Sequence, residues 1–563
     1  MPQELFFVNK TPSSASLTRS QRDERTRILS FVQTNRRKQE SSASYSGTNN
    51  KPSTRRATLA DFGLVEAENT NNTDVAKQGT SISTYYPTHN SSDPFHCTVA
   101  STDAGNHRLI HCTMYSVFRG MYLGEAFAPM SVLSSPFVTG STSRDLNSAK
   151  DQHADVFSAR LKRCVEDPVL MYATLSYGSS FLSWTTGGAG NKRAGFGLGS
   201  DEGDEAPPAE YFLGRALREV RTRLAMYSES WPQSATGGAG GRGKVDPWLI
   251  LSIINLAVTE MWNGMPELWA RFPQKHAVVV RTGHFGRQAS RVHLRALLRL
   301  VGLAGGEVAL GSYVLDSAVL SDKYLRMYEY TEPLMVLDWG PGGVPPQVFP
   351  SKEDPFPRMG TAFAESDSLS AEAKVILQDI ASYCRIAHTA WTRHANSVNS
   401  AMEIWLFRRL QELEVQLMMV YHRPTTGTTD TSAMPASNWV DRCVCFAALV
   451  FLLGCSANVG TQTGANVQAP RLRILLTSGT RDSSMGMDRG LKLWCLSTGA
   501  LLSVKLPARA WFVETMRKVW LEDMGGLDLQ GENASEALTR ALEPYLFLQD
   551  RQSEGIEHIV GQR

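Results

Sequence analysis

The side chains of this chain that could do chemistry are scattered, and the densest group of metal-binding types lies near residue 100. It consists of His96, Cys97, His107, His111 and Cys112. If this segment is helical, two of the histidines share one face, four residues apart. Structural zinc sites are usually built on closely paired ligands such as Cys-x-x-Cys, a spacing that occurs nowhere in the chain. We therefore expect no metal site and no zinc in the purified protein.

Two glycine-rich stretches have spacings that approach nucleotide-binding motifs. Gly238–Lys244 has the spacing Gly-x-x-x-x-Gly-Lys, but Val245 stands where a phosphate loop needs Ser or Thr for magnesium. Gly195–Gly199 lacks the third glycine of a dinucleotide fingerprint, and acidic residues that would repel a pyrophosphate follow it. The chain also has no Gly-x-Ser-x-Gly and no His-Glu-x-x-His. We expect no cofactor, no catalytic residue and no enzymatic activity, although a site assembled from distant residues stays open as the alternative.

The charge of the chain is unevenly distributed. Residues 1–56 carry eleven basic and four acidic side chains, a net charge of +7, and because the whole chain carries +2 the remainder carries −5. Such an arm suits contact with a polyanion or a nuclear import receptor, and a plain solvated tail is the alternative. Nuclear localisation is favoured over direct DNA contact because aromatic side chains are few here. The residues that would meet phosphates or an import receptor are Arg19, Arg22, Arg25, Arg27, Arg36, Arg37 and Lys38.

Hydrophobic spacing in the rest of the chain predicts an all-α protein. The apolar residues of Ala209–Tyr227 follow the helical period, and Asp246-Pro247 is a helix start before the apolar run to Trp262. Strand signals are few. Further helices are expected at 108–118, 154–164, 170–183, 293–304 with an end at Gly305-Gly306, 308–330, 371–384, 402–420, 439–454, 491–503, 508–521 and 534–546.

Composition divides the chain into two parts. Residues 1–92 are rich in Ser, Thr and Asn and poor in large apolar groups, so they predict a basic, largely disordered arm and linker. Residues 93–563 predict a helical domain with surface inserts at 185–207 and 228–245. No signal peptide is expected, and no membrane span, since the longest apolar run has eleven residues, Cys443–Leu453, against roughly 18 for a span. The eight scattered cysteines suggest a reducing compartment.

Several short motifs, taken in order, resemble the fungal-specific transcription factor domain family. The match covers roughly residues 1–38 and 93–525. The stretches that carry it are Phe6-Phe7-Val8-Asn9-Lys10, the basic segment around Arg27-Ile28-Leu29, Asp93-Pro94-Phe95, His293-Leu294-Arg295-Ala296-Leu297, Leu337-Asp338-Trp339-Gly340-Pro341-Gly342, Leu493-Trp494-Cys495-Leu496 and Trp511-Phe512-Val513.

The resemblance implies an all-helical regulatory domain, a nuclear location, protein partners in the transcription machinery, and a role in fungal secondary metabolism. Members of the family often carry a binuclear zinc cluster of six cysteines. This chain departs from them because residues 1–96 contain no cysteine, so these residues cannot form that DNA reader and any nucleic-acid contact would be weak or indirect.

Within the resemblance, Asp338 and Trp339 stand in a segment rich in Pro and Gly. The tryptophan is expected to be a buried wedge between helices, with the aspartate capping a backbone amide. The alternative is that both side chains line a ligand pocket.

Overall fold

The computed structural model divides the chain into two units, Met1–Ser83 and Thr84–Arg563. Every residue that the structure describes belongs to the second unit. The described residues are 106–129 with short internal gaps, 152–185, 209–230, 245–263, 279–304, 306, 310–329, 331–335, 340–350, 354–422, 436–456, 459–478, 486–503, 508–523 and 533–561.

These ranges are built of helices, and no strand is found within them, which confirms the all-α prediction. The longer helices are α5 (Gln152–Glu166), α6 (Pro168–Thr185), α7 (Ala209–Ser230), α8 (Pro247–Asn263), α10 (Val279–Ala304), α11 (Ser312–Glu329), α13 (Ala371–His388), α14 (Ser400–His422), α15 (Ala436–Cys455), α16 (Val459–Ser478), α17 (Arg489–Leu502), α18 (Ala508–Lys518), α19 (Ala534–Leu542) and α20 (Gln549–Val560). Short helices are α3 (Arg119–Glu125), α12 (Thr361–Glu365), η6 (Thr389–Arg393), η7 (Ala395–Ser397) and η9 (Val519–Asp523). None of the helices in these ranges is long and apolar enough to cross a membrane.

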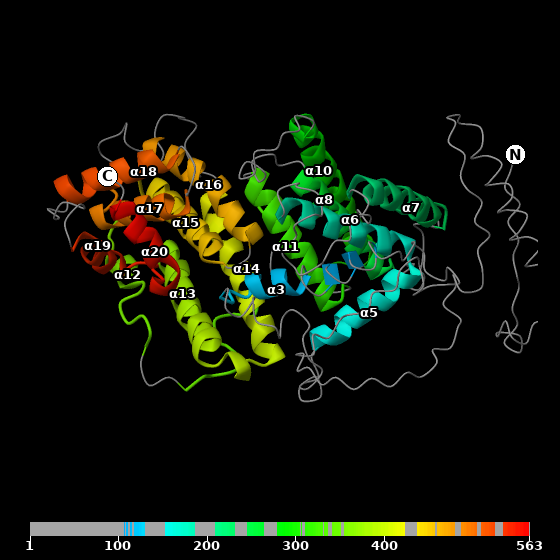
Figure 1. The fold of residues 1–563 in the computed structure, drawn as a ribbon, viewed down its shortest axis with the longest axis horizontal. Coiled ribbons are helices and arrows are strands. Elements are labelled where there is room, and N and C mark those ends of the chain that lie inside the picture. Colours follow the sequence, from blue (N-terminus) through cyan, green and yellow to red (C-terminus); the bar gives the residue numbers. More distant parts are fainter. Residues whose placement is uncertain are drawn as a thin grey trace, which may run out of the picture. The chain divides into compact units, whose positions relative to one another are not determined.

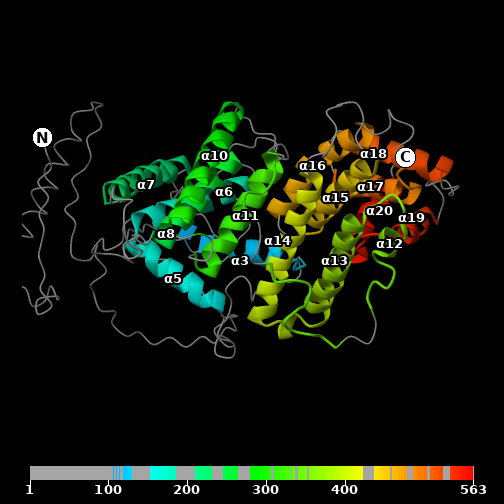
Figure 2. The same ribbon diagram turned by 180° about the vertical axis from the view of Figure 1, so that it is seen from behind.

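Two helices that are apolar on every side form the centres of the packing. In α8, all residues from Leu249 to Ala257 are buried, and α6, α7, α10 and α11 pack around it. In α15, all residues from Cys443 to Leu453 are buried among α13, α14, α16 and α17. A helix without a polar face is stable only when other helices cover it, which these neighbours do (Figures 1 and 2).

Close approach around α15 and α17 depends on small residues. A Cβ atom on Gly454 of α15 would lie 2.2 Å from Leu502 Cδ2 of α17, and one on Gly499 would lie 2.2 Å from Phe512 Cε1 of α18. Both distances are far below van der Waals contact, so these glycines let the helices approach closely.

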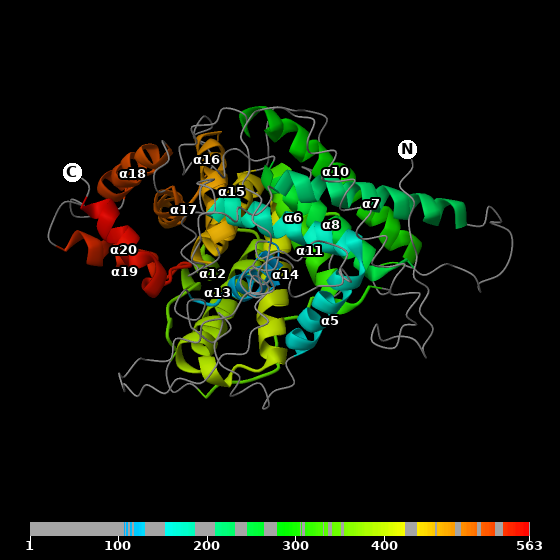
Figure 3. The ribbon, with the colours of Figure 1, turned by 45° about the vertical axis from the view of Figure 1, so that its right-hand side comes forward.

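The helices α3, α11 and α14 join the two groups (Figures 1 and 2), and the view turned by 45° again places α11 beside α14 (Figure 3). Between α11 and α14, the guanidinium of Arg408 donates two hydrogen bonds to Asp316, at 3.0 and 3.2 Å. Burial raises the pKa of Asp316 to about 6, although Arg408 opposes the shift. On α3, the ring of Tyr122 stacks on that of Phe407 of α14, with centroids 4.4 Å apart. These contacts therefore fix how α3, α11 and α14 pack at the middle of the unit.

More than half of the expected helix 108–118 lies outside the described residues. The other expected helices are present, with ends that differ by several residues. The largest difference is α10, which begins at Val279 although the expected helix began at His293. The helices α3, α12, α16 and α20 were missed. Helix α16 contains Pro470 and has no apolar stripe, and α20 is mostly polar with few apolar residues.

Candidate functional site

A sealed cluster of charged side chains lies where α3, α11 and α14 meet. Lys323 of α11 is fully buried, and its Nζ lies 3.2 Å from Glu125 Oε2 of α3 and in contact with Glu414 Oε2 of α14. The hydroxyl of Tyr324 donates to Glu125 Oε1, and Gln411 Nε2 donates to Glu125 Oε2 at 3.0 Å. Three helices from distant parts of the sequence thus place two carboxylates around one ammonium group.

The electrostatics of the sealed cluster follow from its one cation and two acids. Burial lowers the pKa of Lys323, but the Glu125 and Glu414 carboxylates outweigh it and hold that pKa above its usual value. Burial raises the pKa of Glu414 to about 7, with Lys323 partly opposing. Glu414 Oε1 receives no hydrogen bond from a described residue, which leaves it able to carry the proton. The cluster is nearly neutral when Glu414 is protonated, and its complete burial suits a structural role.

The chain that leaves α3 is held by Arg551 of α20. Its guanidinium donates to Phe127 O at 2.8 Å and to Cys455 O at the end of α15, and it lies over the Phe127 ring, 4.3 Å from the centroid. Phe127 has a positive φ of 64°, which is unfavourable for a bulky side chain. Trp391 Nε1 donates to Ala126 O at 2.9 Å, and Ser456 Oγ donates to Gly124 O at 2.9 Å. Side chains from α20, from η6 and from the residue that follows α15 thus fix this turn.

An open cleft lies between the end of α13 and the start of α20, and we take it as the candidate ligand site. Its volume is about 510 Å³, within the roughly 300–1,000 Å³ of small-molecule pockets. The residues that line it are Pro355, Phe356, His388, Arg393, Gln549, Asp550 and Ser553. The loop before α12, the helices α13 and η6, and the first turns of α20 supply them.

His388 is the central side chain of this cleft. Its Nδ1 lies 3.7 Å from Asp550 Oδ2, and Phe356 meets its ring edge-on with centroids 4.7 Å apart. Burial lowers the pKa of His388; Asp550 opposes the shift, while Arg551 and Arg393 add to it. The imidazole is therefore neutral at pH 7 and can accept or donate a hydrogen bond.

The side chains of the cleft suit ligand binding better than catalysis. A serine nucleophile would need its hydroxyl directed at the histidine, whereas Ser553 Oγ donates to Gln549 O at 2.6 Å. What the cleft offers a ligand is an anion at Asp550, a cation at Arg393 and an aromatic edge at Phe356. A small polar molecule with both acidic and basic groups would match them.

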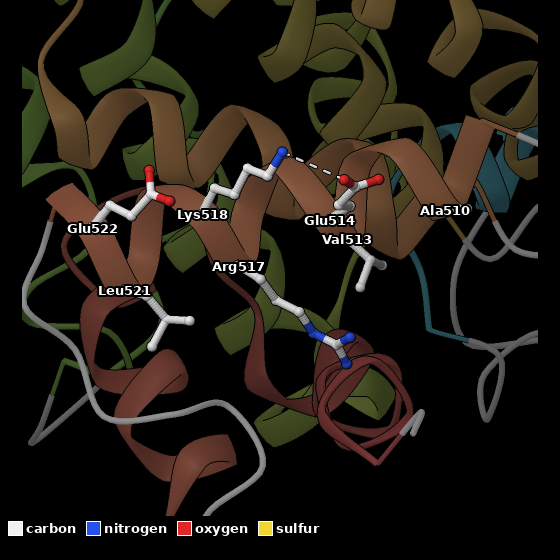
Figure 4. A pocket seen from close by; sticks show the side chains of 7 residues that line it. All are labelled: Ala510, Val513, Glu514, Arg517, Lys518, Leu521 and Glu522. Atoms are coloured by element: carbon white, nitrogen blue, oxygen red, sulfur yellow. Dashed lines mark ion pairs between the residues drawn. The ribbon is translucent and has the colours of Figure 1, made fainter.

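A second groove, on α18 and η9, is more superficial (Figure 4). Its volume is about 440 Å³, and its lining residues are Ala510, Val513, Glu514, Arg517, Lys518, Leu521 and Glu522. Lys518 Nζ pairs with Glu514 Oε1 at 3.4 Å, and both side chains are more than half exposed. Arg517 Nη2 reaches Ile559 O at 3.5 Å, so one cation of the groove is directed at α20. Because these charges are exposed and screened, the groove attracts a charged ligand only weakly.

The site residues expected from the sequence are not tested by this geometry. The basic residues Arg19, Arg22, Arg25, Arg27, Arg36, Arg37 and Lys38 all lie outside the described part of the chain. The same holds for Asp338 and Trp339, for Gly195–Gly199 and Gly238–Lys244, for the histidines and cysteines near residue 100, and for nearly all of the inserts 185–207 and 228–245. No cluster of metal-binding side chains occurs among the residues that are described.

The sealed cluster and the cleft were both missed by sequence reasoning. Lys323 stands between Asp322 and Tyr324 in a polar stretch that is typical of a solvent-facing helix. Its partners lie 198 and 91 positions away, so no local spacing could have joined them. His388 and Asp550 each stand at a helix end without a neighbouring motif.

Comparison with protein-family models, with curated proteins and with solved structures finds no match to this chain. The resemblance to the fungal-specific transcription factor domain family therefore rests on the sequence motifs alone.

Proposed function

We propose that this chain is a nuclear, transcription-regulator-like protein whose helical unit acts by binding and not by catalysis. The observation that carries the proposal is the charge distribution: a net +7 in residues 1–56 beside −5 in the rest of the chain. A concentrated basic segment favours an import receptor or a polyanion as its partner. The ordered motifs that resemble the fungal-specific transcription factor domain family support the same role for the helical unit.

In this proposal the two parts of the chain have separate tasks. The basic residues from Arg19 to Lys38 deliver the protein to the nucleus and contribute weak phosphate contacts at most. The helical unit then receives protein partners of the transcription machinery, or a small ligand in the cleft at His388. The sealed cluster at Lys323 keeps the helical unit intact, because buried and mutually paired charges are inaccessible to substrates.

The test is the distribution of a fluorescent fusion of the full chain. Replacing Arg36, Arg37 and Lys38 by Ala should weaken nuclear accumulation. A matched control replaces Lys51, Arg55 and Arg56 by Ala, which removes the same charge outside the run. Equal accumulation in the parent and the first variant would remove this run from the account, and a cytoplasmic parent would reject the nuclear role.

The cleft favours a second candidate function, a metabolite-binding protein. A neutral histidine beside a carboxylate, in a space of about 510 Å³, gives the helical unit a place for a small ligand. A metabolite panel screened by thermal shift tests this, since a ligand that binds only the folded state raises the melting temperature. The shift should vanish in His388→Phe and persist in the control His558→Phe, which changes an exposed histidine of α20. A panel without any stabilising compound would reject this second function.

A further inference from the structure

Helix α10 is strongly basic, although the chain after residue 56 carries a net charge of −5. Its 26 residues include five arginines and no Asp, Glu or Lys. Three of them, Arg291, Arg295 and Arg299, follow one another at intervals of four residues, so they lie along one face of the helix. All three side chains are exposed. We call these three residues the arginine row.

The opposite face of α10 fixes the direction of the arginine row. Leu294, Leu297 and Leu300 are buried, and α10 packs against α8. The hydroxyl of Ser290 donates to Ala257 O of α8 at 2.8 Å. Because its apolar face is held in the core, the helix cannot rotate about its axis. The arginine row therefore stands on a rigid support, and a partner would have to order little more than the arginine side chains.

The arginine row is poorly neutralised by the protein itself. Arg295 and Arg299 form no ion pair and no side-chain hydrogen bond with the residues that the structure describes. Exposed arginines elsewhere in the helical unit do form pairs, as Arg540 does with Glu536 at 2.9 Å. Like charges four residues apart on a helix destabilise it, and an anion that lies across them removes this repulsion.

Positive charge extends beyond α10 to α7. Arg215, Arg218 and Arg221 of α7 are exposed, whereas Glu219, the acid among them, is half-buried. The charge of Arg221 acts on His293 of α10: burial lowers the pKa of this histidine to about 4, and Arg221 adds to the shift. The potential around the arginine row is therefore positive over two helices, which attracts a polyanion.

The chemistry of the arginine row suits a row of phosphates. A guanidinium donates two parallel hydrogen bonds to a phosphate, which the ammonium of lysine cannot do. Neighbouring arginines of the row are about 6 Å apart along the helix axis, so the row spans about 12 Å. Duplex DNA carries one negative charge per about 1.7 Å of its axis. A DNA backbone beside α10 thus offers a phosphate to each arginine.

Two other anionic partners fit α10 less well. A helix that binds a membrane surface buries its apolar face in the lipid, whereas that of α10 is buried in the protein. Among its described side chains only Val292, which is 60% exposed, is large, apolar and accessible. Single-stranded nucleic acid is held by aromatic side chains on which bases stack, and no Phe, Tyr or Trp occurs between Arg291 and Arg299.

We propose that α10 is a DNA-contacting helix whose arginine row binds the phosphate backbone of double-stranded DNA irrespective of base sequence. The packing of α10 on α8 keeps the helix at the backbone, where contacts position a protein but do not read bases. The choice of DNA as the duplex rests on the proposed nuclear role. The contact itself goes beyond that role, which requires only the basic segment of residues 1–56.

The test is the fluorescence anisotropy of a short labelled DNA duplex titrated with the full chain at salt concentrations between about 50 and 200 mM. Replacing Arg291, Arg295 and Arg299 together by Ala should weaken binding by on the order of tenfold or more. It should also reduce the slope of log K against log salt by roughly 2.7, since each phosphate contact contributes about 0.9. Two duplexes of unrelated sequence should bind equally. Equal melting temperatures verify folding, which alanine at exposed helix positions favours.

The matched control is Arg358→Ala/Lys518→Ala/Arg540→Ala, which removes the same charge from side chains that are 59%, 62% and 64% exposed. It should bind the duplex like the parent, and the basic residues of the N-terminal segment are present in both variants. Phosphatidylserine vesicles serve as a second anionic probe.

Three outcomes would overturn the proposal. The full chain does not bind the duplex, the row variant keeps the affinity and salt slope of the parent, or the control weakens binding as much as the row variant does. A row variant that loses vesicle binding but keeps DNA binding would assign the surface to a membrane instead. A nuclear protein that fails these tests rejects this inference alone, whereas a cytoplasmic parent rejects the nuclear role and, with it, DNA as the partner.

Discussion

The sealed cluster at Lys323 and the open cleft at His388 both pair a basic side chain with carboxylates, yet burial gives them opposite properties. Lys323, Glu125 and Glu414 are inaccessible to water, so each member depends on the others for its solvation. His388 and Asp550 are 19% and 36% exposed, and their nearest charged atoms are 3.7 Å apart. Water solvates this second pair, which leaves it able to exchange its partner for a ligand.

The comparison indicates where function and stability reside in the helical unit. The sealed cluster joins α3, α11 and α14, and its loss should affect the whole unit. The cleft lies between the end of α13 and the start of α20, and its side chains can change with little effect on folding. The predictions below test this division.

The largest effect is expected from Lys323→Met. It removes the cation that pairs with Glu125 and Glu414, and breaking a buried pair typically costs about 3–5 kcal/mol in the free energy of unfolding. The matched control is Lys518→Met, whose pair with Glu514 at 3.4 Å is exposed to water (Figure 4) and should change stability by less than about 1 kcal/mol. Urea unfolding of the full chain measures both. Equal effects of the two variants would contradict the structural role of the sealed cluster.

A smaller effect is expected from Arg551→Lys. Lysine keeps the charge but lacks the planar fork that donates to both Phe127 O and Cys455 O, so about 1–3 kcal/mol of stability should be lost. The control is Arg540→Lys on α19, where the pair with Glu536 is exposed and the change should be close to neutral. If Arg551→Lys melts at the same temperature as the parent, Arg551 does not stabilise the turn at Phe127.

The smallest effects are two pH dependences of opposite sign. The folded state holds the Glu414 proton more tightly than the unfolded chain, because burial raises its pKa from 4.5 to about 7. Its contribution to stability is therefore complete below pH 4.5 and is lost as the pH rises through about 7. The folded state holds the His388 proton less tightly, because burial lowers its pKa from 6.5. That contribution is present above pH 6.5 and is lost as the pH falls through the lowered pKa.

The two terms change over overlapping pH ranges with opposite slopes: the stability from Glu414 falls as the pH rises from 4.5 to about 7, and the stability from His388 falls as the pH drops below 6.5. Unfolding free energies of the parent and of two variants, measured between about pH 5 and pH 8, separate them. Glu414→Gln should remove the loss of stability with rising pH, and His388→Gln should remove the loss with falling pH. An unchanged loss with rising pH in Glu414→Gln would show that Glu414 does not hold its proton as inferred.

Sequence reasoning predicted the fold where hydrophobic spacing was strong. The apolar run after Asp246-Pro247 indicated α8, and the period in Ala209–Tyr227 indicated α7. It missed α16, because a helix interrupted by Pro470 and rich in Gly and Thr has neither good propensity nor an apolar stripe. It missed α20 because most residues of this helix are polar, although Ile556 and Ile559 are fully buried.

Neither the sealed cluster nor the cleft could be predicted from the sequence, since both are assembled from helices far apart along the chain. A lysine in a polar helical stretch normally faces water, whereas Lys323 is buried and meets carboxylates from α3 and α14. The irregular segment between α11 and α12 was predictable in part: the Pro- and Gly-rich composition of 333–346 indicated it, whereas no spacing indicated the contacts of Gln347 with Ser397 and of Phe349 with His394.

The central claim is that this chain regulates transcription from the nucleus, and chromatin occupancy of the tagged full chain, paired with an expression profile of a deletion strain, tests it most directly. The account predicts occupancy at a defined set of loci whose transcripts change when the protein is removed. Uniform background occupancy, together with an unchanged expression profile, would contradict it.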